Sequence, residues 1–375
     1  MSNAAKPPRD PDAVHYERLL AEAARFKGVS PWQDAWKRVR RNRAAMASLL
    51  FLGLLGAITL FTSLLPLQSP IRQDLETRQY LPPNIAPVSL GLRETLASDN
   101  PNAYSQRVSS LWYQPDLFDR TLIRLRVALF GDWCIPSICG TDNLGRDLLA
   151  RLVWGGRVSL KVGLVATFVS LVIGVTYGSV AGYLGGVTDS VMMRFVDILY
   201  SIPFIFIVIF ALTISNEESI KQTLLNYGIT KIVLFYVLIG AIYWLTMARV
   251  VRGQVISLRN EQFVDAARVI GASTPRIIFL HLVPNVLSIV IMYLTLTIPS
   301  VILYEAFLSF LGMGVEPPEA SWGALASDGI RAITSIRIYW WLVVFPGLAL
   351  ALTLLALNFL GDGLRDALDP RLRNR

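Results

Sequence analysis

Uncharged apolar stretches alternate with polar, charged stretches along this chain, and the alternation predicts its architecture. The first apolar run, 44–67, follows the polar and basic residues 1–43, and five more such runs follow it. A transmembrane helix needs about 20 mainly apolar residues, with a range of roughly 17 to 25, so every run is long enough to cross a bilayer. The later runs are 162–188, 198–216, 232–248, 277–304 and 338–361.

The charge balance agrees with a membrane protein. Only 17% of the 375 residues are charged and 53% are hydrophobic, whereas soluble domains carry charge on about a quarter of their residues. The net charge of +8 does not indicate nucleic-acid binding, because the basic residues flank the apolar runs. Membrane proteins place positive charge there to hold short loops in the cytoplasm.

The basic cluster at 37–43 therefore places the N-terminus in the cytoplasm, and six crossings return the C-terminus to the same side. We predict an all-α integral membrane protein of six transmembrane helices, with a long extracytoplasmic insertion between the first two. The expected segments are a cytoplasmic N-terminal segment 1–43, a first transmembrane helix 44–67, an extracytoplasmic loop 68–157, a five-helix core 158–361 with a cytoplasmic loop at 257–285, and a cytoplasmic tail 362–375.

Residues 260–285 form an unusual charged stretch between two apolar runs. We interpret it as a short helix, a turn and a second short helix. Asn260 is the expected N-cap, Gly271 the expected left-handed residue after the first helix, and Thr274 the next N-cap. Pro275 then stands at the first helical position, where proline is favoured. The first helix is expected to present an apolar contact face made of Phe263, Ala266, Ala267 and Ile270.

Other residues carry individual expectations. Cys134 and Cys139 lie in the extracytoplasmic segment and are close enough in sequence to form a disulfide, with two free thiols as the alternative. Glu305, at the outer end of the fifth run, is a candidate for the translocation pathway, with an ordinary boundary charge as the alternative. Gly174, Gly178 and Gly182 recur at every fourth position, which favours close helix packing. No metal site is expected, because the histidines lie far apart and do not cluster with the cysteines.

The sequence has no motif for its own energy source. It lacks a phosphate-binding GxxxxGK[ST] loop and the common hydrolase and metalloprotease motifs. Charged residues inside the apolar runs are scarce, whereas proton- or sodium-driven carriers place them near the bilayer midplane. The chain thus has the pattern of a transport pathway that is driven by another protein.

The charged loop resembles the EAA loop of permease subunits of ATP-binding cassette (ABC) importers. That pattern is Glu-Ala-Ala, three residues, Gly, nine residues and then I-x-L-P. Here it reads Asp265-Ala266-Ala267, Gly271 and HLVP ending at Pro284, with the spacing kept and with Asp in place of Glu. The resemblance implies that the loop docks on an ATPase through Glu261, Asp265, Ala266, Ala267, Gly271, His281, Pro284 and Asn285.

Two more stretches, GTDNLGRDLLARLVWGGRVSL at 140–160 and LSFLGMGVEPPEASWGALASDG at 308–329, together with the terminal NFLGDGLRDALDPR at 358–371, resemble the dipeptide and oligopeptide branch of this family. In 140–160 we also expect Asp142 to cap a helix that begins near Leu144. Segment 68–139 matches no pattern that we can name.

The resemblance implies a type I importer permease in a bacterial inner membrane, which pairs with a second permease as a heterodimer. Its other partners would be membrane lipid, two ABC ATPase domains that bind ATP and Mg, and an extracytoplasmic solute-binding protein. The chain itself would hold no cofactor and catalyse nothing.

Three alternatives stay open. The first is the same importer class with another substrate, such as nickel or glutathione. The second is a channel or secondary transporter that needs no ATPase. The third is a membrane-anchored interaction protein whose polar segment 68–157 does the binding. The spacing of the EAA-like loop favours an importer permease over the last two.

Overall fold

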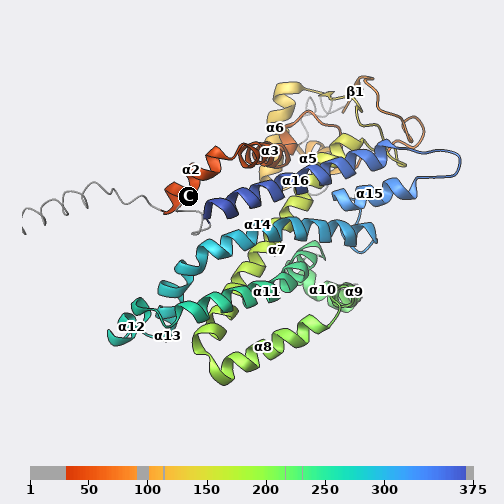
Figure 1. Ribbon diagram of the computed structural model, residues 1–375. Coiled ribbons are helices and arrows are strands. Elements are labelled where there is room, and N and C mark those ends of the chain that lie inside the picture. The colour runs from red at the N-terminus through yellow and green to blue at the C-terminus, as the bar shows by residue number, and fades with distance from the viewer. Residues whose placement is uncertain (1–30, 91–100, 113–114, 216, 230, 369–375) are drawn as a thin grey trace, which may run out of the picture.

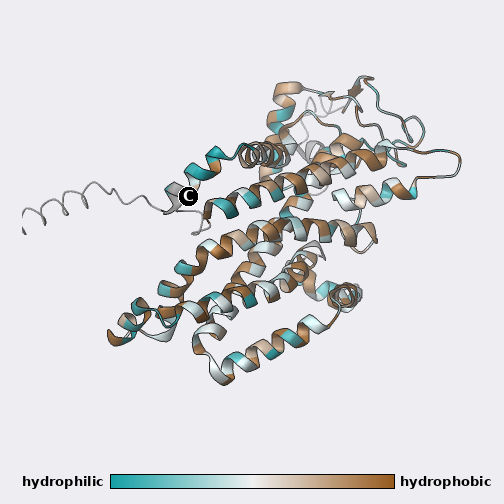
Figure 2. Ribbon diagram, viewed as in Figure 1, coloured by the Kyte–Doolittle hydropathy of each residue, from teal (hydrophilic) through white to brown (hydrophobic). Residues whose placement is uncertain are grey.

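The computed structural model describes residues 31–90, 101–112, 115–215, 217–229 and 231–368, and its regular secondary structure is almost all helical (Figure 1). Residues 1–30 of the predicted N-terminal segment and 369–375 of the predicted tail lie outside this description. Five described helices are long and apolar enough to cross a membrane, and Figure 2 shows hydrophobic residues along most of their length. They are α3 (Arg43–Leu60), α7 (Leu148–Leu184), α11 (Lys231–Leu258), α14 (Val283–Phe310) and α16 (Trp341–Leu368).

The run 198–216, predicted as one membrane-crossing helix, is not a continuous helix in the structure. The structure instead has two helices, α8 (Gly186–Ser201) and α9 (Phe204–Ser215), which are bent by 80° relative to each other. Pro203 explains the break, because proline lacks an N–H and disfavours the helical conformation at the residue before it. Ile202 accordingly has an extended ψ of 122°. The short helix α10 (Glu218–Asn226) follows α9.

The ends of the other apolar runs also differ from the helices. Helix α3 stops at Leu60, before the predicted end at 67, and is followed by a single 3₁₀ turn, η1 (Thr62–Leu64). Helix α7 begins at Leu148, well before the predicted start at 162. The last part of the expected polar loop is therefore the first turns of a membrane helix, and a hydropathy pattern cannot separate the two because those turns carry several arginines.

A small unit lies on the outer side of the bundle, formed by α5 (Pro101–Leu111), α6 (Leu117–Phe130) and two short antiparallel strands, β1 (Val88–Ser89) and β2 (Trp133–Cys134). Arg126 is completely buried in it. Its guanidinium donates to the carbonyl oxygens of Leu65 and Leu67 at 3.0 and 3.1 Å, so it ties the unit to the chain that leaves α3. The apolar core of the unit is Leu90, Val108, Leu111, Trp112, Ile123, Val127 and Cys134.

The short helices mark the two ends of the bundle (Figure 1). Helices α12 (Gln262–Val269) and α13 (Thr274–Arg276) lie on the same side of the view as the end of α16, and α15 (Trp322–Arg331) lies on the other side. Helix α2 (Pro31–Arg41) packs against α16, where buried Ala35 and Val39 meet Ala367. The end with α12 and α13 is called the docking end below, and the end with α15 the outer end.

Helices α7 and α11 form the closest helix pair of the bundle, and the glycines of α7 make the contact. A Cβ atom on Gly174 would lie 2.6 Å from Cβ of Met247, and one on Gly182 would lie 2.8 Å from the carbonyl oxygen of Arg252. A Cβ on Gly178 would overlap the carbonyl oxygen of Ala248. The predicted close packing of the glycine stripe is therefore confirmed, and α11 is its partner.

We expect Gly178→Ala to destabilise the protein by about 1–3 kcal/mol, because the added methyl group meets backbone atoms that cannot move aside. Gly253 is the matched control: it lies in α11, and a Cβ there meets nothing within 4 Å. Gly253→Ala should be neutral or slightly stabilising, since alanine favours helix more than glycine. Thermal unfolding of the two detergent-solubilised variants, compared with the parent protein, measures the difference. Equal melting temperatures for both variants would contradict the close contact.

Candidate functional site

The predicted docking turn is a helix, a left-handed glycine and a second helix, as expected, but its caps are displaced by one residue. Glu261, not Asn260, is the N-cap of α12, with an extended ψ of 150° and an exposed carboxylate that favours the positive end of the helix dipole. Ser273, not Thr274, is the N-cap of α13, and Pro275 stands in its first turn. Gly271 has φ +85°, which confirms the predicted left-handed position.

The exposed apolar face of α12 is not the predicted contact face. Ala267 is buried together with Val264, against Val255 and Ile277 of the neighbouring helices, so it holds α12 in place and is not available for contact. The sequence pattern also missed Val269, which is 88% exposed. The apolar surface that α12 presents to solvent is therefore Phe263, Ala266, Val269 and Ile270.

Arg268 connects α12 to the end of α7. Its guanidinium donates to the Asp265 carboxylate at 2.9 Å and to the Tyr183 hydroxyl at 3.4 Å, and it also lies over the Tyr183 ring, 5.4 Å from the centroid. Asp265, which replaces the Glu of the EAA pattern, is exposed, so its second oxygen is accessible from outside. The i, i+3 spacing of Asp265 and Arg268 could have revealed the pair from sequence, whereas Tyr183 lies too far away in the chain.

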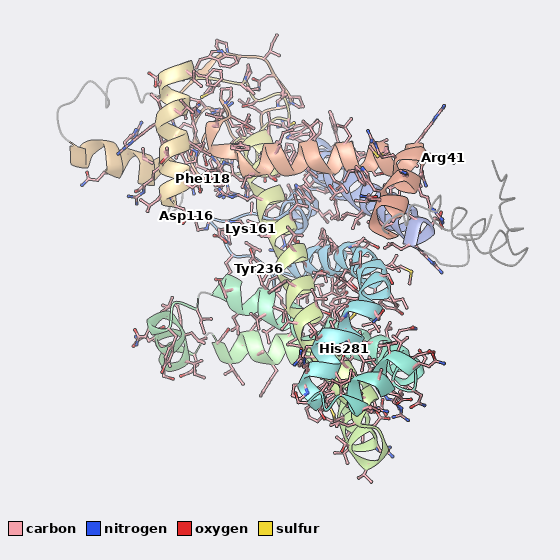
Figure 3. All side chains as sticks on the ribbon, turned by 90° about the vertical axis from the view of Figure 1, so that its left-hand side faces the viewer. Arg41, Asp116, Phe118, Lys161, Tyr236 and His281 are labelled. Atoms are coloured by element: carbon pink, nitrogen blue, oxygen red, sulfur yellow. The ribbon has the colours of Figure 1, made fainter. Side chains whose placement is uncertain are left out.

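The second half of the docking turn leads directly into α14. Residues Ile277–Leu282 form a wider π-helical turn, η2, just before Pro284. Such a turn suits this place because proline cannot donate a backbone hydrogen bond to the preceding turn. The Asn285 side-chain amide donates to the carbonyl oxygen of His281 at 2.7 Å, which adds a hydrogen bond across this turn. His281 lies at the docking end in Figure 3.

Ion pairs fix α8 against α11 near the docking end. Arg252 binds Asp189 with two hydrogen bonds, one of them 2.6 Å long, and Arg249 binds Asp197 at 2.8 Å. The partner of Asp197 therefore comes from α11 and not from its own helix. The charges at this end join the helices to one another.

At the outer end, the stretch 140–160, which resembles the peptide branch of the family in sequence, organises a buried charge network. The expected cap was wrong: α7 begins at Leu148 and its N-cap is Asp147, which accepts from the Ala150 N–H at 2.8 Å. Burial raises the pKa of Asp147 to about 6. Asp142 instead accepts hydrogen bonds from the backbone N–H groups of Leu144 and Arg146 at 2.9 Å and so closes the turn before the helix.

The Asp142 carboxylate also binds two buried arginines, Arg146 at 2.7 Å and Arg151 at 2.6 Å. Arg151 continues to Asp328 of α15 at 3.3 Å. Trp322, at the start of α15, is buried and donates its indole N–H to the carbonyl oxygen of Leu152 at 3.0 Å. The two stretches that carried the family resemblance, 140–160 and 308–329, therefore pack against each other.

Glu305 is fully buried inside the described chain. It accepts hydrogen bonds from the hydroxyl groups of Ser159 at 3.1 Å and Ser309 at 2.7 Å. In this structure it joins α14 to α7 and reaches no surface, and its role in a pathway stays a prediction.

The expected disulfide is not formed in the structure, where Cys134 and Cys139 are free, buried thiols. The Cys134 sulfur accepts a hydrogen bond from Arg126 at 3.2 Å inside the small outer unit. Cys139 packs in a different cluster, with Leu148 and Trp341. The two side chains belong to two separate cores, which their short separation in sequence does not reveal. Among the described residues no group of three or more His, Cys, Asp or Glu is arranged to hold a metal ion.

Five helices long and apolar enough to cross a membrane and a bundle packed through glycines indicate an integral membrane protein, and comparison with known proteins gives its family. Residues 174–374 match the family described as "Binding-protein-dependent transport system inner membrane component", and residues 30–83 match the "N-terminal TM domain of oligopeptide transport permease C". The chain therefore belongs to the family of binding-protein-dependent transport permeases.

Relatives that align over almost their whole length support this family. The chain is 39% identical to the oligopeptide transport system permease protein OppC of Haemophilus influenzae, over 97% of this chain and 96% of that protein. It is 41% identical to OppC of Escherichia coli, over 94% and 96%, and 37% identical to the dipeptide transport system permease protein DppC of Bacillus subtilis, over 94% and 90%. Segment 68–139, for which the sequence alone suggested no counterpart, lies within an alignment that covers almost the whole chain.

The charge network gives a prediction for stability. Asp142→Asn removes the charge that faces Arg146 and Arg151, whose side chains are 7% and 3% exposed, and we expect a loss of about 3 kcal/mol because a buried cation is left without its partner. Asp328→Asn is the matched control, since Asp328 binds the same arginine but is 45% exposed. It should cost about 1 kcal/mol or less. Thermal unfolding in detergent at one scan rate compares them, and a larger effect of Asp328→Asn would contradict the prediction.

Proposed function

We propose that this chain forms half of the translocation pathway of an ATP-driven ABC importer for di- and oligopeptides. The observation that carries the proposal is the near full-length similarity, 37–41% identity, to permease proteins named for oligopeptide and dipeptide transport. The family description, a component of binding-protein-dependent transport systems, supports an extracytoplasmic solute-binding protein as the partner that delivers the substrate.

In this proposal the chain crosses a bacterial inner membrane six times, with both termini in the cytoplasm. The bent pair α8 and α9 serves as one broken span, in addition to the five continuous ones. Arg249, Arg252 and Arg268 then lie at the cytoplasmic end, which agrees with the tendency of short cytoplasmic loops to be basic. The small unit with α5, α6 and the two strands lies on the outer side, where a solute-binding protein would approach.

The docking turn gives the proposal its mechanical element. The exposed side chains Phe263, Val269 and Ile270 provide an apolar patch at the tip of the molecule, and the exposed Asp265 carboxylate beside it provides a charged contact. Solvent-exposed apolar patches of this kind are typical of protein interaction sites. We propose that an ABC ATPase receives this tip in a cleft and that its closure on ATP and Mg moves the helices as rigid bodies.

A second permease completes the pathway, most simply as a heterodimer with two ATPase domains, and ATP hydrolysis takes place on those separate subunits. Alternating access then follows from the joint movement of both permeases. In this proposal the chain binds the ATPase, moves its helices and lines the pathway, and it catalyses no reaction itself.

The proposal is tested by substitution of Gly271. Gly271 has a φ of +85°, so Gly271→Asp strains the turn by about 1–2 kcal/mol. A Cβ atom there would meet nothing within 4 Å, so the new side chain fits and places a charge at the docking tip. We expect the variant to reach the membrane but to lose co-purification of the ATPase subunits and uptake of labelled peptide into proteoliposomes.

Gly228→Asp is the matched control, because Gly228 also has a positive φ, +72°, and open space around it, but lies in the turn between α10 and α11. It should retain both co-purification and uptake. Unimpaired uptake with Gly271→Asp, or a parent protein that never co-purifies with the ATPases of its own transport system, would refute the docking role.

A further inference from the structure

A pocket of about 250 Å³ lies at the outer end of the bundle, outside the docking site. Four segments enclose it: residues 70–71, the start of α6, the outer half of α7 and the turn at 318–320 before α15. Its chemistry is unusual for a surface so near the membrane, because it is lined by charges of both signs. These are Asp116, Asp119, Arg151, Arg157, Lys161 and Glu319.

Half of these charges already have partners and form the walls. Arg157 donates to both oxygens of the Asp119 carboxylate, at 2.8 and 2.9 Å. The Ser63 hydroxyl donates to the same carboxylate at 2.7 Å. Arg151 belongs to the network of Asp142 and Asp328. These bonds set the shape of the pocket before any ligand arrives, as a preorganised site requires.

The other three charges, Asp116, Lys161 and Glu319, have no ion pair or hydrogen bond within the described part of the chain. Glu319 is half-buried. Burial raises its pKa, and Lys161 opposes that rise, so the two side chains influence each other across the pocket. Asp116 and Lys161 are exposed, so the cost of a partly desolvated charge without a partner applies to Glu319. A ligand that carries a positive group would relieve it.

Figure 3 labels Asp116 and Lys161, two of the residues that line the pocket. Asp116 of α6 and Lys161 of α7 lie close together in this view, at the boundary between the outer unit and the bundle. Tyr236 of α11 lies next to Lys161 toward the bundle, and His281 marks the far, docking end. Tyr236 is almost fully buried. The free charges therefore stand where a substrate released on the outer side would first meet the helices.

We propose that this pocket binds the charged termini of a short zwitterionic peptide, with Lys161 binding the carboxylate and Glu319 and Asp116 binding the ammonium group. Fixed charges of both signs suit such a ligand better than a simple anion or cation, since one of the signs would repel either of those. The pocket, of about 250 Å³, presents Lys161 on α7 and Glu319 on the facing turn, so charges of both signs line the same space. This inference rests on the proposed peptide transport function and assigns it a first binding site within the permease.

The test measures binding without the solute-binding protein, which would select peptides on its own. The complete complex, with both permeases and both ATPases, is placed in nanodiscs of phosphatidylglycerol, and saturation-transfer NMR is recorded with tri-alanine. Tri-alanine should give a signal that is lost when its N-terminus is acetylated or its C-terminus amidated. Lys161→Met and Glu319→Gln should each weaken binding about tenfold, the effect of one charge-assisted contact.

Lys161→Arg should restore binding, because it keeps the positive charge. The matched control is Lys221→Met, which removes an exposed lysine of α10 outside the pocket and should leave the affinity for tri-alanine unchanged.

Equal signals for free and doubly blocked tri-alanine, or an unchanged affinity in both Lys161→Met and Glu319→Gln, would overturn the assignment. So would loss of the tri-alanine signal on adding phosphatidylethanolamine to the nanodiscs, since a lipid headgroup would then be the occupant. Failure of the parent complex to take up peptide from a loaded solute-binding protein, measured separately in proteoliposomes, would refute the proposed function instead.

Discussion

The contact between α7 and α11 is the constraint on which the rest of the bundle depends. Three glycines of α7 bring its backbone against that of α11, so close that a single methyl group at Gly178 would meet a carbonyl oxygen. In a membrane, helices gain little from burying apolar side chains against each other, and close backbone packing takes over as the source of association. Once this pair is fixed, α8 is attached to α11 by ion pairs at Asp189 and Asp197, and α14 lies against both.

The same pair positions both functional regions. The docking helix rests on the last turns of α11 through Val264 and Ala267, and it reaches the end of α7 through Arg268. At the other end, the first turns of α7 carry Arg151, Arg157 and Lys161 toward the outer pocket. Helix α7 therefore contributes residues both to the proposed docking turn and to the proposed peptide site, so a shift of this helix would move parts of both.

Features set by local sequence could be predicted, and features set by distant partners could not. The apolar runs predicted the membrane helices because the bilayer imposes a length, and Gly271 predicted its own conformation because few other residues adopt it. The glycine spacing predicted close packing but could not name α11. Ala267 looked like part of the contact face until its neighbours Val255 and Ile277 were known. The break at Pro203 had a visible cause, yet the apolar run on both sides concealed it. The free cysteines illustrate the same limit, because each thiol follows the core in which it lies and not the distance to the other along the chain.

Helix α7 is a continuous element of 37 residues, about 55 Å long, with a charge network at its outer end and the Tyr183–Arg268 contact at its docking end. Two binding sites at the ends of one rigid element can be linked thermodynamically. If binding at one end changes the affinity at the other end, binding at the other end changes the first affinity by the same factor. In the proposed importer, a peptide that favours one position of the outer turns would change the affinity of the ATPase for the docking tip, and nucleotide-driven closure would change the affinity for the peptide by the same factor. Peptide binding and ATP use would then be linked through the two ends of one helix.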